Sequence, residues 1–444
     1  MNRYFKPIFL EQRFFTFLIS LITGFILAYF FPNILGVIQL LFFLFLILLG
    51  VDILMIFMSK GRVDAQRTVP DKLSNGDVNT IHLKVVNSYL FTVGLKIIDE
   101  LPHQFQKRDF DIRTQLLKGA QQQFTYTLRP TARGVYSFGS LHIYVRSPLC
   151  LVSRRYTFDT GAEVPVYPSF LQLRKYDLMA FTNRLHEYGL KKIRRIGHTM
   201  EFEQIKEYVQ GDDIRNINWK ATAKKNLLMV NQFQDEKSQP IYSVIDKGRV
   251  MKMPFEGLSL LDYAINATLV VSNIALKKQD KAGMFTFSNG IENWVVAERR
   301  SSQMNLILET LYNLSTNFTE SDFSTLYIAI KRSLNHRSLL LLYTNFETMD
   351  ALHRQLPYLQ RLAKHHLLVV IFFENTELTL FTEQKATTAQ QIFEQTIAEK
   401  FVYEKKLIVN ELRKHGIQTI LTKPEDLTIN TINKYLEIKA RGLL

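Results

Sequence analysis

Residues 195–225 read RIGHTMEFEQIKEYVQGDDIRNINWKATAKK. The residue patterns before and after this stretch differ, so it separates two regions of the chain. Acidic and basic side chains alternate through it, while apolar residues recur near the spacing of one helical turn. The apolar positions are Phe202, Ile205, Tyr208 and Val209. Gly211 interrupts the pattern, and Asp213 is placed to accept hydrogen bonds from the first N–H groups of a helix that starts at Ile214. The sequence therefore predicts a helix, a tight turn and a second helix.

Several short phrases in this stretch form a longer pattern. They are G-x-x-x-E-F from Gly197, K-E-Y from Lys206, G-D-D-x-R from Gly211 and I-x-W-x-A from Ile217. The pattern resembles the signature of a family of bacterial membrane proteins, the domain-of-unknown-function-58 family. Members of that family look like von Willebrand factor A proteins with this signature placed before the A-type domain. Lys206 and Lys224 stand where the family pattern leads us to expect arginine, so the charge is kept and the planar guanidinium is lost.

The charges of the signature segment are evenly mixed, and no nucleophile stands beside a base. We therefore predict that the segment docks a partner and carries no catalytic dyad. The alternative is that the same charges hold two helices against a neighbouring domain. Arg215 and Trp219 lie four residues apart, so on one helix they would share a face, and both residue types often anchor interfaces. The candidate docking residues are Glu201, Phe202, Glu207, Tyr208, Gly211, Asp212, Asp213, Arg215, Trp219 and Lys220.

Length and charge set outer limits on the protein. A chain of 444 residues is long enough for two or three domains and a membrane segment. Its 55 Lys and Arg against 41 Asp and Glu give a net charge of +14, which suits an anionic surface. No basic run with interleaved aromatic residues marks a nucleic-acid groove, so we attribute the positive charge to membrane orientation and expect no nucleic-acid partner. The single cysteine, Cys150, favours a reducing compartment.

Two apolar runs, residues 14–31 and 34–58, lie near the start of the chain. Each is long enough to cross the roughly 30 Å hydrocarbon layer as a helix, so we predict a transmembrane hairpin within residues 1–62. Basic residues flank both outer ends of the hairpin and the turn has none, which places everything beyond Arg62 in the cytoplasm. Asp52 lies near the cytoplasmic end of the second run, where we expect it to reach the interface rather than act as an acid within the membrane.

The rest of the chain changes its pattern twice. Residues 63–170 show short runs of period-two alternation, which predict the antiparallel strands of a β-sandwich. Residues 171–240 hold the signature segment. In residues 241–444 short apolar strands alternate with helical patterns, which predicts a mostly parallel sheet covered on both faces. The predicted fold class is a multidomain membrane protein with a transmembrane hairpin, a β-sandwich-like domain and an α/β, Rossmann-like domain, which the resemblance identifies as von Willebrand A-like.

Open α/β sheets bind ligands at the carboxyl ends of their strands, which here points to Asp246 and Asn345. A von Willebrand A domain usually has a metal site there, with D-x-S-x-S after the first strand and a threonine and an aspartate from later loops. This chain reads D-K-G-R-V from Asp246 and has Asn345 at the later aspartate position. Because Mg²⁺ needs oxygen ligands, we predict a degenerate, metal-free site around Asp246, Asp322 and Asn345. Asp246 is expected to pair with Lys247, Arg249 or a neighbouring loop, and Asp322 to cap a helix.

The sequence contains no phosphate-binding loop of the G-x-x-x-x-G-K-[ST] type and no G-x-S-x-G elbow. We therefore expect no cofactor and no enzymatic activity. The resemblance implies a partner, because members of the family are associated with MoxR-type AAA+ ATPases. The predicted function is a scaffold or adaptor of the bacterial inner membrane that docks protein partners and works with such an ATPase in the assembly or maturation of protein complexes. The alternative is an enzyme or a metal-dependent ligand-binding receptor whose site is not visible in linear motifs.

Overall fold

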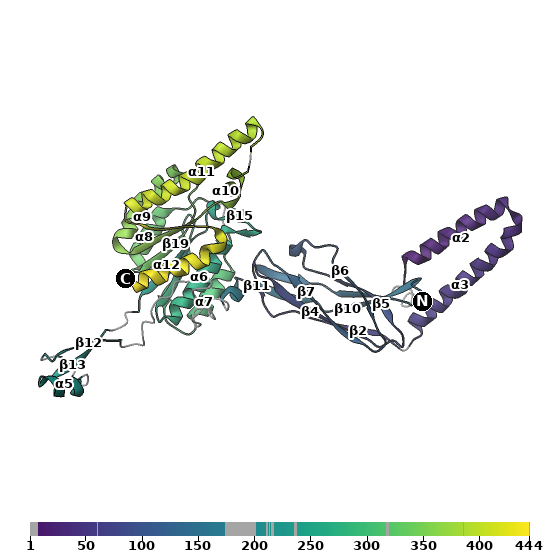
Figure 1. Cartoon of the computed structure of the whole chain (residues 1–444), viewed down its shortest axis with the longest axis horizontal. Helices are drawn as coiled ribbons and strands as arrows, with labels where there is room; N and C mark the ends of the chain where they lie inside the picture. Colours follow the sequence, from purple (N-terminus) through teal and green to yellow (C-terminus); the bar gives the residue numbers. More distant parts are fainter. Residues whose placement is uncertain are drawn as a thin grey trace. The chain divides into compact units, whose positions relative to one another are not determined.

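The structure is a computed structural model with two compact units, Met1–Tyr167 and Pro168–Leu444 (Figure 1). The first unit contains two helices and a β-rich part. The second contains an α/β sheet and a small β-hairpin with a short helix, within residues 201–234, which we call the hairpin element. The residues that the structure describes are 8–59, 61–173, 201–209, 212, 214, 217–234, 238–316, 319–384 and 386–443.

Two apolar helices, α2 (Gln12–Phe30) and α3 (Leu35–Phe57), are joined by the short 3-10 turn η1 (Pro32–Ile34). Pro32 occupies the first position of that turn, where a backbone N–H has no partner within the helix and its loss costs little. By length and composition both helices are able to cross a membrane, with mean hydropathies of 1.8 and 3.0 over their most apolar windows. The two apolar helices predicted from the sequence are confirmed.

The rest of the first unit consists of strands that are antiparallel to their neighbours, apart from the short parallel pair β3 and β11. The strands are β1 (Ile8–Leu10), β2 (Val63–Thr68), β3 (Leu73–Ser74), β4 (Asn79–Asn87), β5 (Val93–Asp99), β6 (Asp111–Leu116), β7 (Gln121–Leu128), β8 (Gly134–Phe138), β9 (Leu141–Arg146), β10 (Val152–Phe158) and β11 (Ala162–Tyr167). They form the sheets β1-β10-β9-β5-β6, β2-β4-β7 and β3-β11-β8 around one apolar core. Buried and exposed residues alternate along β4, so the predicted β-sandwich is confirmed.

A buried ion pair connects the strands of this core. The Arg67 guanidinium pairs with the Asp99 carboxylate, and neither side chain has any exposed area. Arg67 Nη2 also donates to the carbonyl oxygens of Gly139 (2.8 Å) and Thr160 (2.6 Å), while Tyr126 Oη donates to Asp99 Oδ2 at 2.5 Å. Burial and the Asp99 charge raise the pKa of Tyr126, so the phenol remains a donor. Because each charge has several partners, the pair avoids much of the cost of desolvation.

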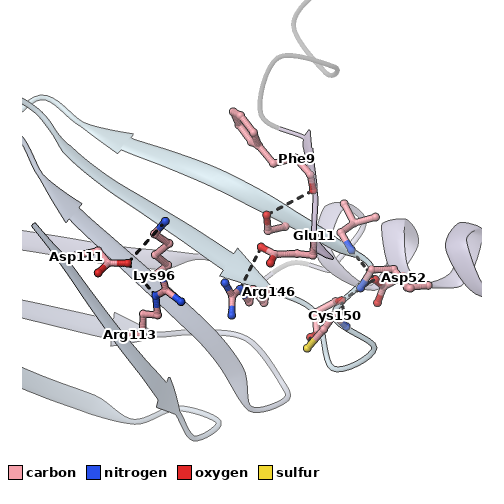
Figure 2. Close-up of polar contacts among 12 residues, drawn as sticks. Phe9, Glu11, Asp52, Lys96, Asp111, Arg113, Arg146 and Cys150 are labelled. Carbon is pink, nitrogen blue, oxygen red and sulfur yellow. Dashed lines mark hydrogen bonds and ion pairs between the residues drawn. The ribbon is translucent and has the colours of Figure 1, made fainter. Parts of the chain in front are cut away.

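The carboxylate of Asp52, in α3, is buried against the loop between β9 and β10 (Figure 2). Its Oδ2 accepts hydrogen bonds from Ser147 Oγ at 2.6 Å, Leu151 N at 3.1 Å and Val152 N at 3.0 Å. Asp52, which we expected at the membrane interface, is held by hydrogen bonds to the β-rich part of the same unit. Three donors converge on it from a turn that lies about 100 residues further along the chain, and such a pairing is not visible in the local pattern.

The chain before α2 is attached to the same loop. Strand β1 pairs antiparallel with the start of β10, with Leu10 opposite Val152. Glu11 N donates to Leu151 O at 3.0 Å, and the Glu11 carboxylate contacts Arg146 Nε at 3.1 Å (Figure 2). Both outer ends of the helical hairpin are therefore fixed to the β-rich part by hydrogen bonds.

The second unit contains a six-stranded sheet in the order β18-β17-β14-β19-β20-β21, in which only β18 is antiparallel to its neighbour. The strands are β14 (Pro240–Asp246), β17 (Lys281–Phe287), β18 (Ile291–Glu298), β19 (Leu339–Tyr343), β20 (Leu367–Phe373) and β21 (Gln418–Thr422). The helices are α6 (Leu260–Lys277), α7 (Gln303–Tyr312), α8 (Phe323–Ser333), α9 (Met349–His365), α10 (Thr376–Thr382), α11 (Ala389–Lys414) and α12 (Leu427–Ala440).

Helices cover both faces of this sheet (Figure 1). One core combines residues of α6, α7 and α12 with alternate strand residues such as Ile245 and Leu341. The other core combines residues of α8, α9 and α11 with the intervening residues, such as Val244 and Leu342. Both sides of each central strand are buried, which explains the continuous apolar runs LLLLY and LLVVIFF. The predicted mostly parallel sheet with two covered faces is confirmed.

The prediction of a helix-turn-helix in the signature segment is wrong. The described residues form a strand, β12 (Glu201–Glu207), paired with β13 (Met229–Gln234), and a short helix, α5 (Trp219–Lys225), between them. A register shift between Phe202 and Gln204 adds one residue to β12. Residues on one face of a regular strand recur every two positions. The added residue makes one of these intervals three positions long, which is also close to one helical turn. The second helix begins at Trp219 and not at Ile214, with Asn218 as its cap.

We predict that Asp52→Ala destabilises the first unit by about 1–3 kcal/mol, because one hydroxyl and two buried N–H groups lose their acceptor. Denaturation of the full chain in detergent, monitored by circular dichroism, measures the change. The control is Asp64→Ala, which removes a surface pair with Arg62 and should cost less than about 1 kcal/mol. Equal effects of the two substitutions would contradict the structural role of Asp52.

Candidate functional site

The carboxyl ends of β14 and β19 meet at the centre of the α/β sheet. From β14 the chain builds β17 and β18 on one side, and then crosses to build β19, β20 and β21 on the other. Such a reversal of strand order leaves a crevice where open α/β sheets bind ligands. Asp246 ends β14, and Thr344 and Asn345 follow β19, so the candidate site lies among these residues.

The carboxylate of Asp246 is fully buried and accepts hydrogen bonds from three different loops. Oδ1 accepts from Gly248 N at 2.8 Å and from the Ser321 hydroxyl, and Oδ2 accepts from Thr344 Oγ1 at 2.7 Å. Burial raises the pKa of Asp246, while the three donors act in the opposite direction. Of the pairings expected for Asp246, the one with a neighbouring loop is present.

Gly248 and Ser321 occupy one small space beside Asp246. A Cβ at Gly248 would lie 2.0 Å from Ser321 Oγ and 3.1 Å from Asp246 Oδ1. A side chain at Gly248 and the Ser321 hydroxyl therefore exclude one another. The hydroxyl that the D-x-S-x-S pattern supplies two residues after the aspartate comes here from a loop 75 residues away.

The cations next to Asp246 have other partners. Lys247 Nζ pairs with Glu292 Oε2, and Arg249 lies 3.8 Å from Glu320 at the surface. Asp322 caps α8, as predicted, because Oδ1 accepts from Ser324 N at 2.8 Å and Oδ2 from Thr325 Oγ1 at 2.6 Å. These hydrogen bonds hold the pKa of Asp322 below its usual value.

Asn345 faces a lysine. Its Oδ1 accepts a hydrogen bond of 2.6 Å from Lys405 Nζ, which comes from α11. Burial lowers the pKa of Lys405 to about 8, and the charge of Glu347 acts in the opposite direction. Both Asn345 and Lys405 line a cavity of about 430 Å³ at the carboxyl ends of β19, β20 and β21.

This set of side chains does not fit the divalent cation of a von Willebrand A site. Of the two candidate carboxylates, Asp246 accepts hydrogen bonds from the loops at the strand ends. Both oxygens of Asp322 instead cap α8. Asn345 offers its carbonyl oxygen to an ammonium group, and a metal ion there would lie next to that charge. In the parts of the chain that the structure describes, no group of three or more His, Cys, Asp or Glu converges.

Comparison with known proteins relates part of the signature and most of the α/β sheet to one family. Residues 204–387 match the family described as protein of unknown function DUF58. This region of the chain belongs to DUF58. A similar protein is the uncharacterized YeaD of Bacillus subtilis strain 168, which is 25% identical over 125 residues, or 28% of this chain and 30% of the relative. The match therefore spans less than a third of that relative.

Two solved structures to which parts of the chain are similar give low TM-scores. The CARDB domain of a Pyrococcus furiosus protein gives a TM-score of 0.19 at 16% identity, covering 24% of this chain and 88% of that one. Proximal thread matrix protein 1 of the mussel byssus gives 0.27 at 8% identity, covering 46% of each chain.

Several of the candidate docking residues of the signature lie in the hairpin element. Lys206 Nζ pairs with Asp212 Oδ1 at 3.0 Å, and Val209 N donates to Asp212 Oδ2 at 3.1 Å. The Val209 N–H and then Lys206 hold the pKa of Asp212 below its usual value. Trp219 is 69% exposed at the start of α5.

The remaining candidate docking residues fall into three groups. Glu207, Tyr208 and Lys220 lie in the same hairpin element, where Glu207 and Lys220 are exposed and Tyr208 is half-buried. Glu201 and Phe202 belong to strand β12. The residues outside the described part of the chain are Gly211, Asp213 and Arg215. The predicted shared helical face of Arg215 and Trp219 lies outside what the structure describes, because Arg215 is not among the described residues.

Two residues of the site were missed by sequence reasoning. Ser321 and Lys405 each reach the strand ends from an element far along the chain. Ser321 precedes the cap Asp322, and this position before a helix is a weak signal that it lies at the same edge of the sheet. Lys405 sits among polar residues of the long helix α11, and its spacing does not distinguish it from solvent-facing lysines.

We predict that Gly248→Ser destabilises the α/β unit by about 1–3 kcal/mol, because the new side chain displaces the Ser321 hydroxyl from the buried Asp246 carboxylate. Urea denaturation measures the change. Gly290→Ser is the control, because no atom lies within 4 Å of a Cβ at Gly290.

Adding Ser321→Ala to Gly248→Ser removes the clash. The double variant should therefore be no less stable than Ser321→Ala alone, which is a strongly non-additive result. Additive costs would show that the two side chains do not compete for one space.

Proposed function

We propose that this chain is a membrane-anchored, non-catalytic adaptor that docks protein partners and works with an AAA+ ATPase of the MoxR type. In this proposal α2 and α3 are transmembrane, the β-rich and α/β units are cytoplasmic, and the α/β unit is a von Willebrand A-like domain without a bound metal. The ATPase supplies the nucleotide hydrolysis for which this chain has no phosphate-binding loop. The process served is the assembly or maturation of protein complexes.

The two helices support the membrane anchor. Only 6% of the most apolar window of α2 and 17% of that of α3 are buried in the protein, so most of their apolar side chains face outward. A soluble protein would expose this surface to water at a high cost, whereas a bilayer would bury it. Basic residues at Arg13 and Arg62 flank the hairpin, which favours a cytoplasmic location for both ends.

The observation that carries the adaptor role is the exposed apolar surface of the hairpin element. Large apolar side chains are at least 38% exposed on β12, after it, at the start of α5 and just before β13. They are Ile205, Val209, Ile214, Trp219, Leu227 and Leu228. A tryptophan in such a setting is the residue type most often found at the centre of protein interfaces.

The charges of α5 suggest the nature of the partner surface. Lys220, Lys224 and Lys225 are exposed on this one short helix, next to Trp219. A partner with an acidic rim around an apolar pocket would complement this arrangement and gain association rate from it. We assign that surface to the AAA+ partner which the DUF58 signature implies.

The proposed topology predicts the accessibility of introduced cysteines. Asn33→Cys lies in the turn η1, and Leu117→Cys lies at a position that is 68% exposed in the β-rich part. With Cys150→Ser as the background, a membrane-impermeant maleimide should label intact spheroplasts at position 33 only. Position 117 should be labelled after permeabilisation. The reverse pattern would place the β-rich part outside the membrane.

The docking role predicts that Trp219→Ala lowers the capture of the AAA+ ATPase at least about 10-fold, which corresponds to an interface residue worth 1.4 kcal/mol or more. The measurement is co-purification from native membranes with a non-hydrolysable ATP analogue and identification by mass spectrometry. Trp294→Ala is the matched control, because Trp294 is 47% exposed on β18 and is the only other tryptophan.

The melting temperature of the Trp219→Ala variant should change by no more than a few degrees, since its side chain contributes little buried area. Unchanged capture by this variant, or equal loss in Trp294→Ala, would contradict docking through the hairpin element.

A further inference from the structure

A cavity of about 430 Å³ opens where β19, β20 and β21 end, between α10 and α11. Its volume lies within the range of roughly 300–1,000 Å³ that small-molecule sites occupy. Most of its wall is apolar. The apolar lining residues include Met253, Phe255, Phe373, Leu378, Phe401 and Leu421.

Two nitrogen donors stand in this apolar wall. Lys405 is half-buried, and its Nζ lies 5.8 Å from the ring centre of Phe372. Because Asn345 Oδ1 accepts from Lys405, the amide Nδ2 is the group of Asn345 that can bind a further ligand. In the described part of the chain, the hydrogen bond of the Asn345 side chain is made through Oδ1, which leaves Nδ2 as a donor for a ligand. An ammonium and an amide N–H₂ side by side are matched to a carboxylate, which accepts through two oxygens.

We propose that this cavity binds a carboxylate attached to an apolar group, with Lys405 and Asn345 as donors to the carboxylate and the aromatic wall around the apolar part. The ligand class includes small apolar acids and the end of a peptide with an apolar last residue. This site is separate from the hairpin element and does not require the ATPase. Failure of the adaptor role would therefore leave this proposal intact.

The other charged groups that line the cavity are Glu347, Glu374, Glu377 and Lys406. Glu374 is half-buried, whereas Glu347 and Glu377 are exposed, so water and salt screen the repulsion that these two exert on an incoming anion. Lys405 is desolvated, and its attraction for a carboxylate is correspondingly stronger. If the ligand also has a positively charged group, the glutamates favour one in which that group lies far from the carboxylate.

The protonation of Lys405 sets the pH dependence. Its pKa of about 8 lies below the usual value of 10.5, so the ammonium is present below pH 8 and is lost as the pH rises through that value. A bound carboxylate favours the charged form and raises this pKa. The affinity for a carboxylate should therefore fall between pH 7 and pH 9.5 as Lys405 loses its charge.

The test is isothermal titration of the full chain in detergent with 4-phenylbutyrate at pH 7, and with 4-phenylbutanamide as a neutral probe of the same shape. The acid should bind saturably with a Kd of about 1 mM or tighter, and the amide at least about 10-fold more weakly. Lys405→Met should weaken binding of the acid at least about 10-fold, and so should pH 9.5. Lys406→Met is the matched control, and it should change the affinity less than about 2-fold, because Lys406 lines the same cavity at an exposed position.

Equal binding of the acid and the amide, no saturable binding of the acid, or acid binding that survives Lys405→Met would overturn the proposal. If Lys405→Met lowers the melting temperature, Asn345→Ala replaces it and should also weaken the acid about 10-fold, since it removes the second donor. An acetylated pentapeptide ending in leucine, as free acid and as amide, identifies the source of the ligand. Tighter binding of the free-acid peptide than of 4-phenylbutyrate assigns the site to protein carboxyl termini, and the opposite order assigns it to small acids.

Discussion

The buried carboxylate of Asp246 is the constraint on which the site end of the α/β sheet depends. It ends the central strand β14, and it receives one hydrogen bond from its own loop, one from the loop before α8 and one from the end of β19. A buried acid without such donors would cost several kcal/mol, so these hydrogen bonds hold the three loops together around it. The position of Asn345, one residue after Thr344, follows from this arrangement, and with it the position of the neighbouring cavity.

At these strand ends the side-chain oxygens of Asp246 and Asn345 are bound to hydrogen-bond donors, which is unlike a site for a divalent cation. Where a metal ion would need converging anionic oxygens, Asp246 is occupied by hydroxyl and amide donors, and Asn345 is bound to an ammonium group. Ser321 supplies the hydroxyl next to Asp246, and Gly248 leaves the space that this hydroxyl fills.

Local patterns in the sequence were sufficient for most of the fold. The alternation in β4, the apolar runs of β19 and β20 and the cap at Asp322 all act over a few residues, and all are present in the structure. The failures have two causes. In β12 an added residue changed the apparent period, so a strand resembled a helix. The contacts of Asp52, Ser321 and Lys405 join residues that lie 95, 75 and 60 positions apart, and no local pattern records such pairings.

The attachment of the helical hairpin has a mechanical consequence. Strand β1, which precedes α2, is paired with β10. Asp52 of α3 is hydrogen-bonded to the start of β10. Both helices are therefore attached to the β-rich part by hydrogen bonds as well as by the chain. In a bilayer, the tilt of the helices would fix the inclination of this β-rich part to the membrane plane. A sideways force on it would act on the helices as a torque, and a change in bilayer thickness that alters helix tilt would rotate it in turn.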